Sequence, residues 1–134
     1  MALPTNAKER KDVPIYSGVL KYFPNALAAV AACSKAGNDQ HNPGKPLHWD
    51  RSKSGDELDA LTRHLMEAGT VDTDGIRHSA KVAWRALANL EKELERAKAT
   101  EMDAVALMRA PASGASGFGA DNGMLAPSVP KNHW

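Results

Sequence analysis

Hydrophobic side chains recur every three or four residues along much of this 134-residue chain, which is the spacing of amphipathic helices. The first such stretch predicts a helix from Pro24 to Gly37, because proline suits an opening turn and glycine suits the position after a helix end. One side of this helix carries only small and medium side chains, which predicts close packing against another helix: Leu27, Val30, Ala31 and Ser34.

A second helix is predicted from Ser54 to Gly69. Its opening sequence, SGDE, has the form of a capping box, in which the side chains of Ser54 and Glu57 cap the first turn. The pattern then separates an apolar face from a polar one: Leu58, Leu61 and Leu65 share the first, and Asp56, Asp59, Arg63 and Glu67 share the second.

A third helix is predicted to open at the sequence DTDG, with Asp74 as its N-cap residue, and to extend to about Lys98. It also has two stripes: Ile76, Ala80, Ala83, Leu87, Leu90 and Leu94 are apolar, and His78, Lys81, Arg85 and Asn89 are polar. The segment MDAVALMRA would add a short fourth helix. The segment VPIYSGVL is the one strand candidate, and we interpret it as an extended lead-in. The predicted fold class is therefore all-α.

Composition changes at both ends of the chain and suggests a domain division. Residues 1–12 are polar and charged and predict a flexible N-terminus, residues 13–109 form one predicted domain, and residues 110–134 predict a flexible tail rich in Gly, Ala and Pro.

Seventeen Lys and Arg residues nearly balance sixteen Asp and Glu residues, which excludes an overall basic field for nucleic acid. No apolar stretch approaches the roughly 20 residues of a membrane span, so we expect no membrane partner.

A single cysteine, Cys33, excludes a disulfide within one chain and favours a reducing compartment. The sequence therefore predicts a cytoplasmic protein. Because the helices present small-residue faces, we also expect the chain to complete its core by pairing as a homodimer or homotetramer.

The loop GNDQHNPGKPLHWD, residues 37–50, concentrates unusual chemistry between two predicted helices. Its prolines and glycines restrict the backbone. Its side chains offer a metal ligand, hydrogen-bonding groups, a phosphate contact and a stacking surface: Asp39, His41, Asn42, Lys45, His48 and Trp49. Trp49 has a second interpretation, in which it fills the core beneath the loop.

Two aspartates and a basic stripe extend this chemistry into the next two helices. Asp56 and Asp59 are three residues apart, so both carboxylates project to one side at a spacing that suits a divalent metal. Either set alone is more typical of a solvated helix face. Acidic residues followed by cations on the next helix, however, are what a metal-bound polyphosphate requires.

The stretch from Tyr16 to Leu65, together with DTDGIRHSAKVAWRALANLEKELE, resembles the phage-encoded dATP/dGTP diphosphohydrolases. These are distant relatives of the MazG-like all-α nucleoside triphosphate pyrophosphohydrolases, and the nearest type is the MazZ type of phages that replace adenine with 2-aminoadenine. The resemblance covers about residues 14–95, and GNDQHNPGKPLHWDRSKS is its most specific part.

This resemblance implies a MazG-like helical bundle completed by oligomerisation, in the cytoplasm of the infected host cell. It implies a Mg²⁺- or Mn²⁺-dependent enzyme that cleaves a purine (deoxy)nucleoside triphosphate between the α and β phosphates. The substrate would be dGTP or GTP, and the products would be the monophosphate and pyrophosphate. The dGMP would supply 2-aminoadenine DNA synthesis.

Site residues follow from the same resemblance. MazG-type enzymes carry an ExxE pair on one helix and an ExxD pair on the next; Asp56 and Asp59 match the second pair in kind, and the first pair is unmatched. Only Asp39 is available to replace it, either on a helix that continues through Gly37 or on the loop. The predicted metal ligands are Asp39, Asp56, Asp59 and Glu67, and Asp72 or Asp74 could complete the set.

The same three aspartates and His64, which would orient the attacking water, are the predicted catalytic residues. The predicted substrate contacts are Asn42, Lys45, His48, Trp49, Arg63, His78, Lys81 and Arg85.

Two other classes of protein were weighed. An HD-type phosphohydrolase needs an adjacent His-Asp pair, and the sequence has none. A non-catalytic helical interaction module of a phage explains the second and third helices, but it gives no reason for the polar loop around Trp49.

Overall fold

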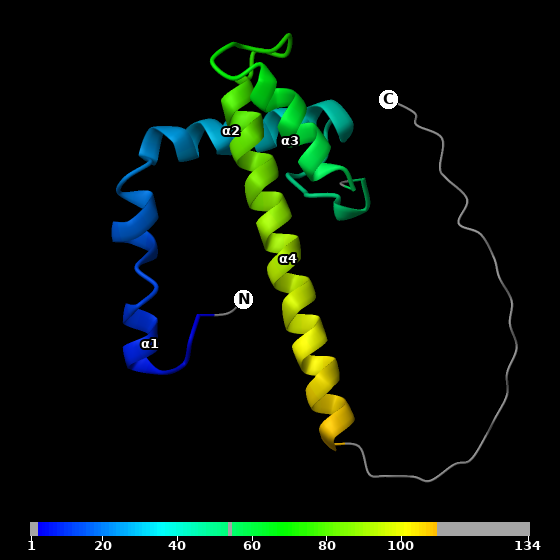
Figure 1. Cartoon of the computed structure of the whole chain (residues 1–134). Coiled ribbons are helices and arrows are strands. Elements are labelled where there is room, and N and C mark those ends of the chain that lie inside the picture. The colour runs from blue at the N-terminus through cyan, green and yellow to red at the C-terminus, as the bar shows by residue number, and fades with distance from the viewer. Residues whose placement is uncertain (1–2, 54, 110–134) are drawn as a thin grey trace, which may run out of the picture.

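The computed structural model describes residues 3–53 and 55–109, which form an arrangement of helices (Figure 1). The α-helices are α1 (Ala7–Lys11), α2 (Pro24–His41), α3 (Glu57–Met66) and α4 (His78–Arg109), with a π-helical turn at Tyr16–Leu20 and a 3-10 turn at Arg51–Lys53. Within the described ranges the only β-type pairing is an isolated bridge between Val71 and Arg77. The all-α prediction is confirmed.

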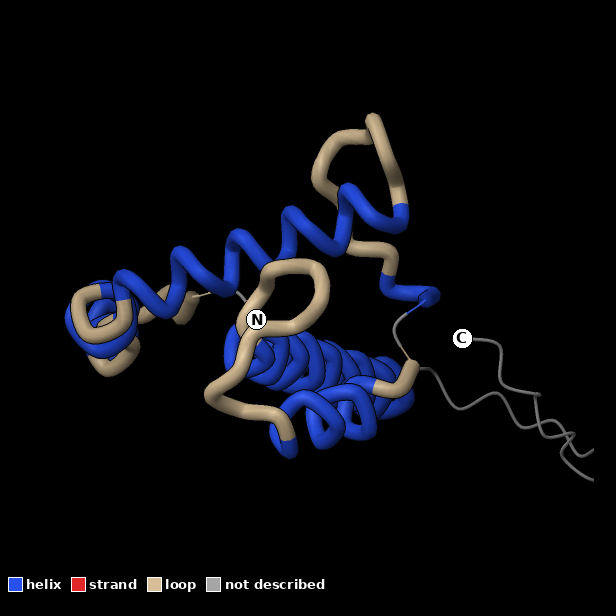
Figure 2. The backbone as a smooth tube through the Cα atoms, turned by 90° about the horizontal axis from the view of Figure 1, so that it is seen from above, coloured by secondary structure: helices blue, strands red, loops and turns tan. Residues whose placement is uncertain are grey.

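Helix α2 crosses the beginning of α4, and α3 lies beside the same end of α4, so the two are neighbours of one helix (Figures 1 and 2). The predicted end of α2 at Gly37 is wrong, because the helix continues to His41. Gly37 keeps a negative φ, so it is simply tolerated in the helix, and the stop comes from Pro43, which disfavours helical backbone at Asn42. Asp39 therefore lies on the helix and not on the loop.

Helix α3 is shorter than predicted, since it ends at Met66 with Glu67 as its C-cap. The proposed capping box cannot be placed, because Ser54 lies outside the described residues. The side chain of Glu57 is buried and accepts a hydrogen bond from Lys92 Nζ of α4 at 2.8 Å. The start of α3 is thereby tied to the middle of α4.

The predicted start of α4 and its division from a fourth helix are both wrong. The sequence DTDG forms a turn with Gly75 at φ +80°, and Asp74 Oδ1 accepts a hydrogen bond from Ile76 N within that turn, so Asp74 does not cap a helix. The helix begins at His78 and continues through MDAVALMRA to Arg109, because neither glycine nor proline interrupts residues 98–109.

The N-terminal region also differs from the sequence-based picture. VPIYSGVL forms the π-helical turn at Tyr16–Leu20 instead of an extended lead-in. The segment predicted to be flexible includes α1, whose first turn is capped by Asn6 and which has no buried residue. The predicted tail, 110–134, lies outside the described residues.

Small side chains make up the apolar core of the described part of the chain: Ala60, Ala80 and Ala88. Helix α3 turns Ala60 toward α4, which leaves Leu58 and Leu65 of its predicted core face 61% and 55% exposed. Leu87, Leu90 and Leu94 of α4 are exposed as well. No helix among these residues is long and apolar enough to cross a membrane.

Candidate functional site

A pocket of about 290 Å³ opens where α2, the loop after it, α3 and the first turns of α4 come together. Figure 2 shows the loop leaving the end of α2, extending outward and returning to the 3-10 turn. Its walls combine aromatic, amide, imidazole and cationic side chains. These include Asn38 and His41 from α2, Asn42, His48 and Trp49 from the loop, His64 from α3, and Lys81, Trp84 and Arg85 from α4.

Asn38 holds the loop on the pocket. The side chain is buried; its Nδ2 donates to the Lys45 carbonyl at 3.2 Å, and its Oδ1 accepts from His48 N at 3.1 Å. Sequence reasoning missed this residue because it ended the helix at Gly37. The signal was present, since Asn38 continues the packing face of α2 one turn beyond Ser34.

Trp49 lies between the loop and α4. Its ring meets Trp84 edge to face with centroids 5.7 Å apart, and the Arg51 guanidinium lies 4.4 Å from its centroid. Its Nε1 is buried and has no hydrogen-bond partner among the described residues. Trp49 thus both packs and lines the pocket, and its Nε1–H is a donor that a ligand could satisfy.

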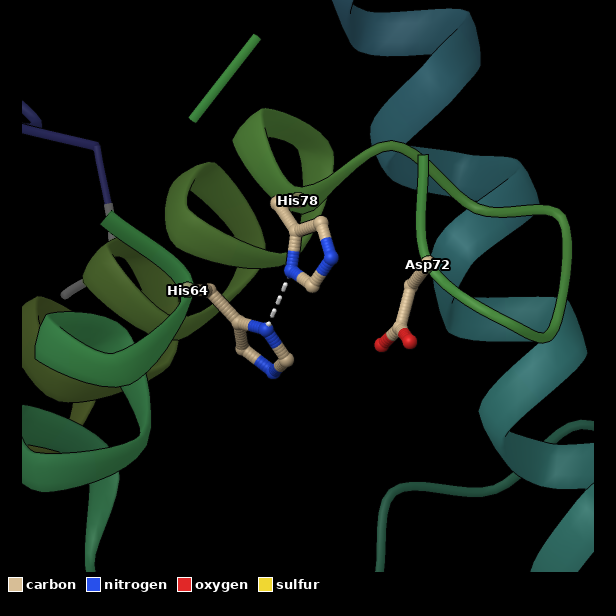
Figure 3. A group of neighbouring side chains, drawn as sticks. All are labelled: His64, Asp72 and His78. Carbon is tan, nitrogen blue, oxygen red and sulfur yellow. Dashed lines mark hydrogen bonds between the residues drawn. The ribbon is translucent and has the colours of Figure 1, made fainter. Parts of the chain in front are cut away.

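A second group of polar side chains lies around the turn between α3 and α4. His64 on the last turn of α3 and His78 at the start of α4 place their Nδ1 atoms 3.0 Å apart, and the carboxylate of Asp72 faces the same space (Figure 3). One ligand atom from each residue lies within 4.8 Å of the others. Two imidazoles and a carboxylate are suitable donors for one divalent cation.

The backbone of this turn explains the convergence. Asp72 N donates to the Ile76 carbonyl at 2.9 Å, Gly75 N donates to the Asp72 carbonyl at 2.9 Å, and His78 N donates to the Thr70 carbonyl at 3.2 Å. Gly69 and Gly75 adopt positive φ values that other residues disfavour. The chain therefore reverses tightly enough to bring α4 back beside the last turn of α3.

Lys81 connects this group to the pocket. Its Nζ lies 2.6 Å from an Oδ2 atom of both Asp72 and Asp74. The hydrogen bond from Lys81 holds the pKa of Asp72 well below its usual range. Burial alone would lower the pKa of Lys81, but hydrogen bonds to the two carboxylates raise it. Lys81 is therefore held at the pocket wall as a cation paired with two carboxylates, and Arg85 lies one turn further along α4.

His64 faces the pocket from the other side. Burial, followed by the charges of Lys81 and His78, lowers the pKa of His64. The neutral imidazole, which has one nitrogen lone pair available, is the favoured form.

Comparison with protein families decides among the sequence-based interpretations. The model of the family described as dATP/dGTP diphosphohydrolase, N-terminal, matches residues 5–103. The chain belongs to this family. No curated protein and no solved structure matched the chain.

The predicted membership of the dATP/dGTP diphosphohydrolases and the prediction of an enzyme are therefore confirmed: the chain is a nucleoside triphosphate diphosphohydrolase. A nucleoside triphosphate is its substrate class. The polar loop around Trp49, which the hypothesis of an interaction module left unexplained, forms one wall of the pocket.

The diphosphohydrolase brings most of its predicted substrate contacts together, although their roles stay predictions. Five line the pocket, namely Asn42, His48, Trp49, Lys81 and Arg85, and so does His64, which was predicted as a catalytic residue. His78 is buried and does not line the pocket. Lys45 accepts a hydrogen bond from Asn38 through its carbonyl, and it does not line the pocket either. Arg63 is exposed and pairs with Asp56.

Three of the four predicted metal ligands of the diphosphohydrolase pair with other side chains of the protein. Asp39 pairs with Lys35 one turn earlier in α2, Asp56 pairs with Arg63 at 3.0 Å, and Asp59 is exposed on α3. Glu67 instead contacts His78, with Oε2 3.0 Å from Nε2. Within the described residues, none of these four carboxylates belongs to a group of three converging donors, so their assignment as ligands stays a prediction.

Proposed function

We propose that this enzyme hydrolyses purine (deoxy)nucleoside triphosphates, dGTP and GTP above others, between the α and β phosphates in a metal-dependent reaction. The observation that carries the proposal is the composition of one pocket. Two indoles, three imidazoles and three amides meet two cations of α4 in a volume of about 290 Å³. Aromatic walls suit a base and cations suit a polyphosphate, so both halves of a nucleotide find partners there.

The base is assigned to the Trp49–Trp84 side of the pocket. Large aromatic side chains offer more contact to a two-ring base than to a one-ring base, which favours purines. Arg51 and Trp84 contact the Trp49 ring, whereas its Nε1–H has no hydrogen-bond partner among the described residues. We therefore assign this Nε1–H as a hydrogen-bond donor to the base. Choosing guanine over adenine requires partners for O6, N1 and N2, and Asn42 and His48 are the polar loop side chains in reach.

The triphosphate is assigned to the α4 side. Lys81 is held by two carboxylates, and Arg85 lies one turn away, so the two cations form a ready-placed pair on one helix face. Arg85 offers a fork of donors for the β and γ phosphates. His64 lines the pocket from α3, where it would orient the attacking water. A divalent ion, when bound, would neutralise phosphate charge and lower the pKa of a water.

The biological role follows from the resemblance to the MazZ type. Hydrolysis of dGTP yields dGMP, which would be a precursor for 2-aminoadenine nucleotides in a phage-infected cell. This role is supported by the GNDQHNPGKPLHWD loop, which carries the most specific part of the resemblance and forms one wall of the pocket.

We also propose that the enzyme works as a homo-oligomer. The described part of a single chain buries only three alanines as apolar core, while leucines remain exposed on α3 and α4. A second, largely apolar groove of about 540 Å³ lies between α2 and α4, lined by residues that include Leu27, Val30, Leu87, Leu90 and Leu94. A second copy could cover these surfaces through the same patch on both chains.

The test is a panel of purine and pyrimidine nucleoside triphosphates, incubated with purified protein and Mg²⁺ or Mn²⁺. We expect pyrophosphate and a monophosphate, fastest with dGTP, and loss of activity with a chelator. Release of a diphosphate and inorganic phosphate would contradict the cleavage site. Equal rates with purines and pyrimidines would contradict the assignment of the base to the indoles.

A further inference from the structure

The turn between α3 and α4 holds a group of ligands that the predicted carboxylate set does not include. We propose that His64, Asp72 and His78 form a binding site for one divalent transition-metal ion, oriented by Glu67. This inference deepens the proposed function, because it names the ion class and its ligands beside the phosphate side of the pocket. The binding itself does not depend on which nucleotide is hydrolysed.

The distance between the two imidazoles fits a shared ion. Two nitrogen ligands about 2.1 Å from one ion, at right angles to each other, lie about 3.0 Å apart. The Nδ1 atoms of His64 and His78 are 3.0 Å apart. In the metal-free protein the same distance fits a hydrogen bond, in which one ring donates Nδ1–H to the other.

Glu67 decides which ring nitrogen of His78 is available. Its Oε2 lies 3.0 Å from Nε2 of His78, so it accepts the Nε2–H and leaves Nδ1 with a lone pair. Carboxylates commonly hold metal-bound histidines in this way and raise their basicity. Glu67 therefore acts as a positioning residue. His78 is 5% exposed, so its ring cannot turn freely to another partner.

The charge of the group matches a divalent cation. The carboxylates of Glu67, Asp72 and Asp74 carry three negative charges, and the Lys81 ammonium in contact with the two aspartates carries one positive charge. With neutral imidazoles, two negative charges remain, which one divalent ion would balance. Lys81 therefore reduces the charge of the group without cancelling it.

The donor types select the class of ion. Imidazole nitrogens suit Mn²⁺, Fe²⁺, Co²⁺ and Zn²⁺, whereas Mg²⁺ takes oxygen ligands almost exclusively. Three protein ligands leave coordination positions for water or a phosphate oxygen. His64 and Lys81 both line the nucleotide pocket, so these positions adjoin the assigned triphosphate side.

Metal binding is measured on full-length protein without a histidine tag, stripped with a chelator and free of nucleotide. Titration with Mn²⁺, Co²⁺, Zn²⁺ and Mg²⁺ by calorimetry is expected to show one site that binds Co²⁺ and Zn²⁺ at least roughly 100-fold more tightly than Mg²⁺. Cu²⁺ added to wild-type protein is expected to give a paramagnetic resonance spectrum with splitting from two imidazole nitrogens. Equal affinity for Mg²⁺, or a spectrum without nitrogen splitting, would overturn the proposal.

Variants then assign the ligands. Asp72→Asn is expected to weaken Co²⁺ binding by roughly 100-fold or more, and Glu67→Gln by about 10–100-fold, the range typical of outer carboxylates. His64→Gln is expected to remove one nitrogen from the Cu²⁺ spectrum, whereas His41→Gln, an exposed histidine at the end of α2, is expected to leave both. Asp103→Asn, an exposed aspartate of α4, is the matched carboxylate control.

Asp59→Asn separates this site from the carboxylate pair predicted by the sequence. If Asp59→Asn weakens binding and Asp72→Asn does not, the ion lies on the α3 carboxylates and the inference is wrong. Thermal unfolding of each metal-free variant shows whether that variant is folded. If a variant is unfolded, the Cu²⁺ spectrum of the wild-type protein still tests whether two imidazole nitrogens bind the ion. A failed nucleotide panel beside intact metal binding would refute the proposed substrate and leave the site standing.

Discussion

The two ends of α4 differ in how much of their side chains is buried. From His78 to Arg85 nearly every side chain is buried or half-buried, and Lys81 is held by two carboxylates. From Ala86 to Arg109 only Ala88 is buried, and large apolar side chains such as Leu87, Leu90 and Met108 are exposed. The first end lines the pocket, and the second leaves apolar side chains exposed, as the proposed self-association would require.

This difference gives each end its own kind of sensitivity. Changes near Lys81 should alter catalysis and leave association unchanged. Changes along the exposed leucines should alter association first, and activity only through it.

The largest effect is expected from Lys81→Gln. Loss of a fixed cation at the phosphates should lower kcat/KM for dGTP by about 100-fold to 1,000-fold, the usual range for removing a charge-stabilising donor. Pyrophosphate release measures it. Lys98→Gln, in the exposed half of the same helix, is the control and should leave the rate unchanged. Equal rates for Lys81→Gln and wild type would remove Lys81 from the site.

Leu90→Glu tests the exposed part of α4, residues 86–109. A charge in the apolar groove should weaken self-association by about 30-fold, equivalent to ~2 kcal/mol at an interface anchor. Sedimentation velocity over a range of concentrations measures this change. Met108→Glu, which alters a side chain that is 88% exposed and outside the groove, is the comparison. A wild-type protein that stays monomeric at all concentrations would contradict the proposed oligomer.

Trp49→Phe is expected to have a moderate effect confined to the base. Phenylalanine keeps an aromatic ring against Trp84 but removes the buried Nε1–H, and one hydrogen bond is worth about 1 kcal/mol. KM should rise about fivefold to tenfold for purine triphosphates and little for pyrimidines, with the metal requirement unchanged. An unaltered ranking of substrates in a folded variant would show that the base is recognised elsewhere.

The smallest effect is expected from Gly37→Ala. Gly37 lies inside α2 with a negative φ, and an added Cβ would meet no atom within 4 Å. Alanine should stabilise the fold by about 0.5–1 kcal/mol, because glycine loses more backbone entropy in a helix. Chemical denaturation measures the change. Gly75→Ala, at φ +80°, is the opposite case and should destabilise the protein.

Local patterns were sufficient to predict the fold class and the approximate positions of the three main helices. Helix ends were less predictable, because two signals competed. Gly37 looked like a stop, yet Pro43 provides the actual one. At the start of α4, Asp74 has the residue type of an N-cap but is used inside the preceding turn.

The parts of the site that depend on residue type were predictable from the sequence. The parts that depend on how a helix is rotated about its axis were not. The loop, Lys81 and Arg85 were identified from composition and helical spacing, and they do line one pocket. Helical spacing predicted that Asp56 and Asp59 share one side of the helix, but Asp56 is the N-cap residue before α3, and spacing does not indicate which side of a helix faces α4. That choice depends on Ala60, whose small side chain lies against α4. The convergence of His64, Asp72 and His78 depends on the backbone conformation of the turn between α3 and α4, which the sequence pattern did not predict.

The compact turn between α3 and α4 also has a consequence for the order of folding. All three proposed metal ligands lie within fifteen consecutive residues of a helical hairpin, so their contacts close a short loop and cost little chain entropy. The nucleotide pocket instead needs α2, which is far earlier in the sequence. Contacts of low sequence separation form fastest. We therefore expect amide protection to develop first across α3 and the start of α4, with Asn38 and its loop docking onto an already assembled hairpin.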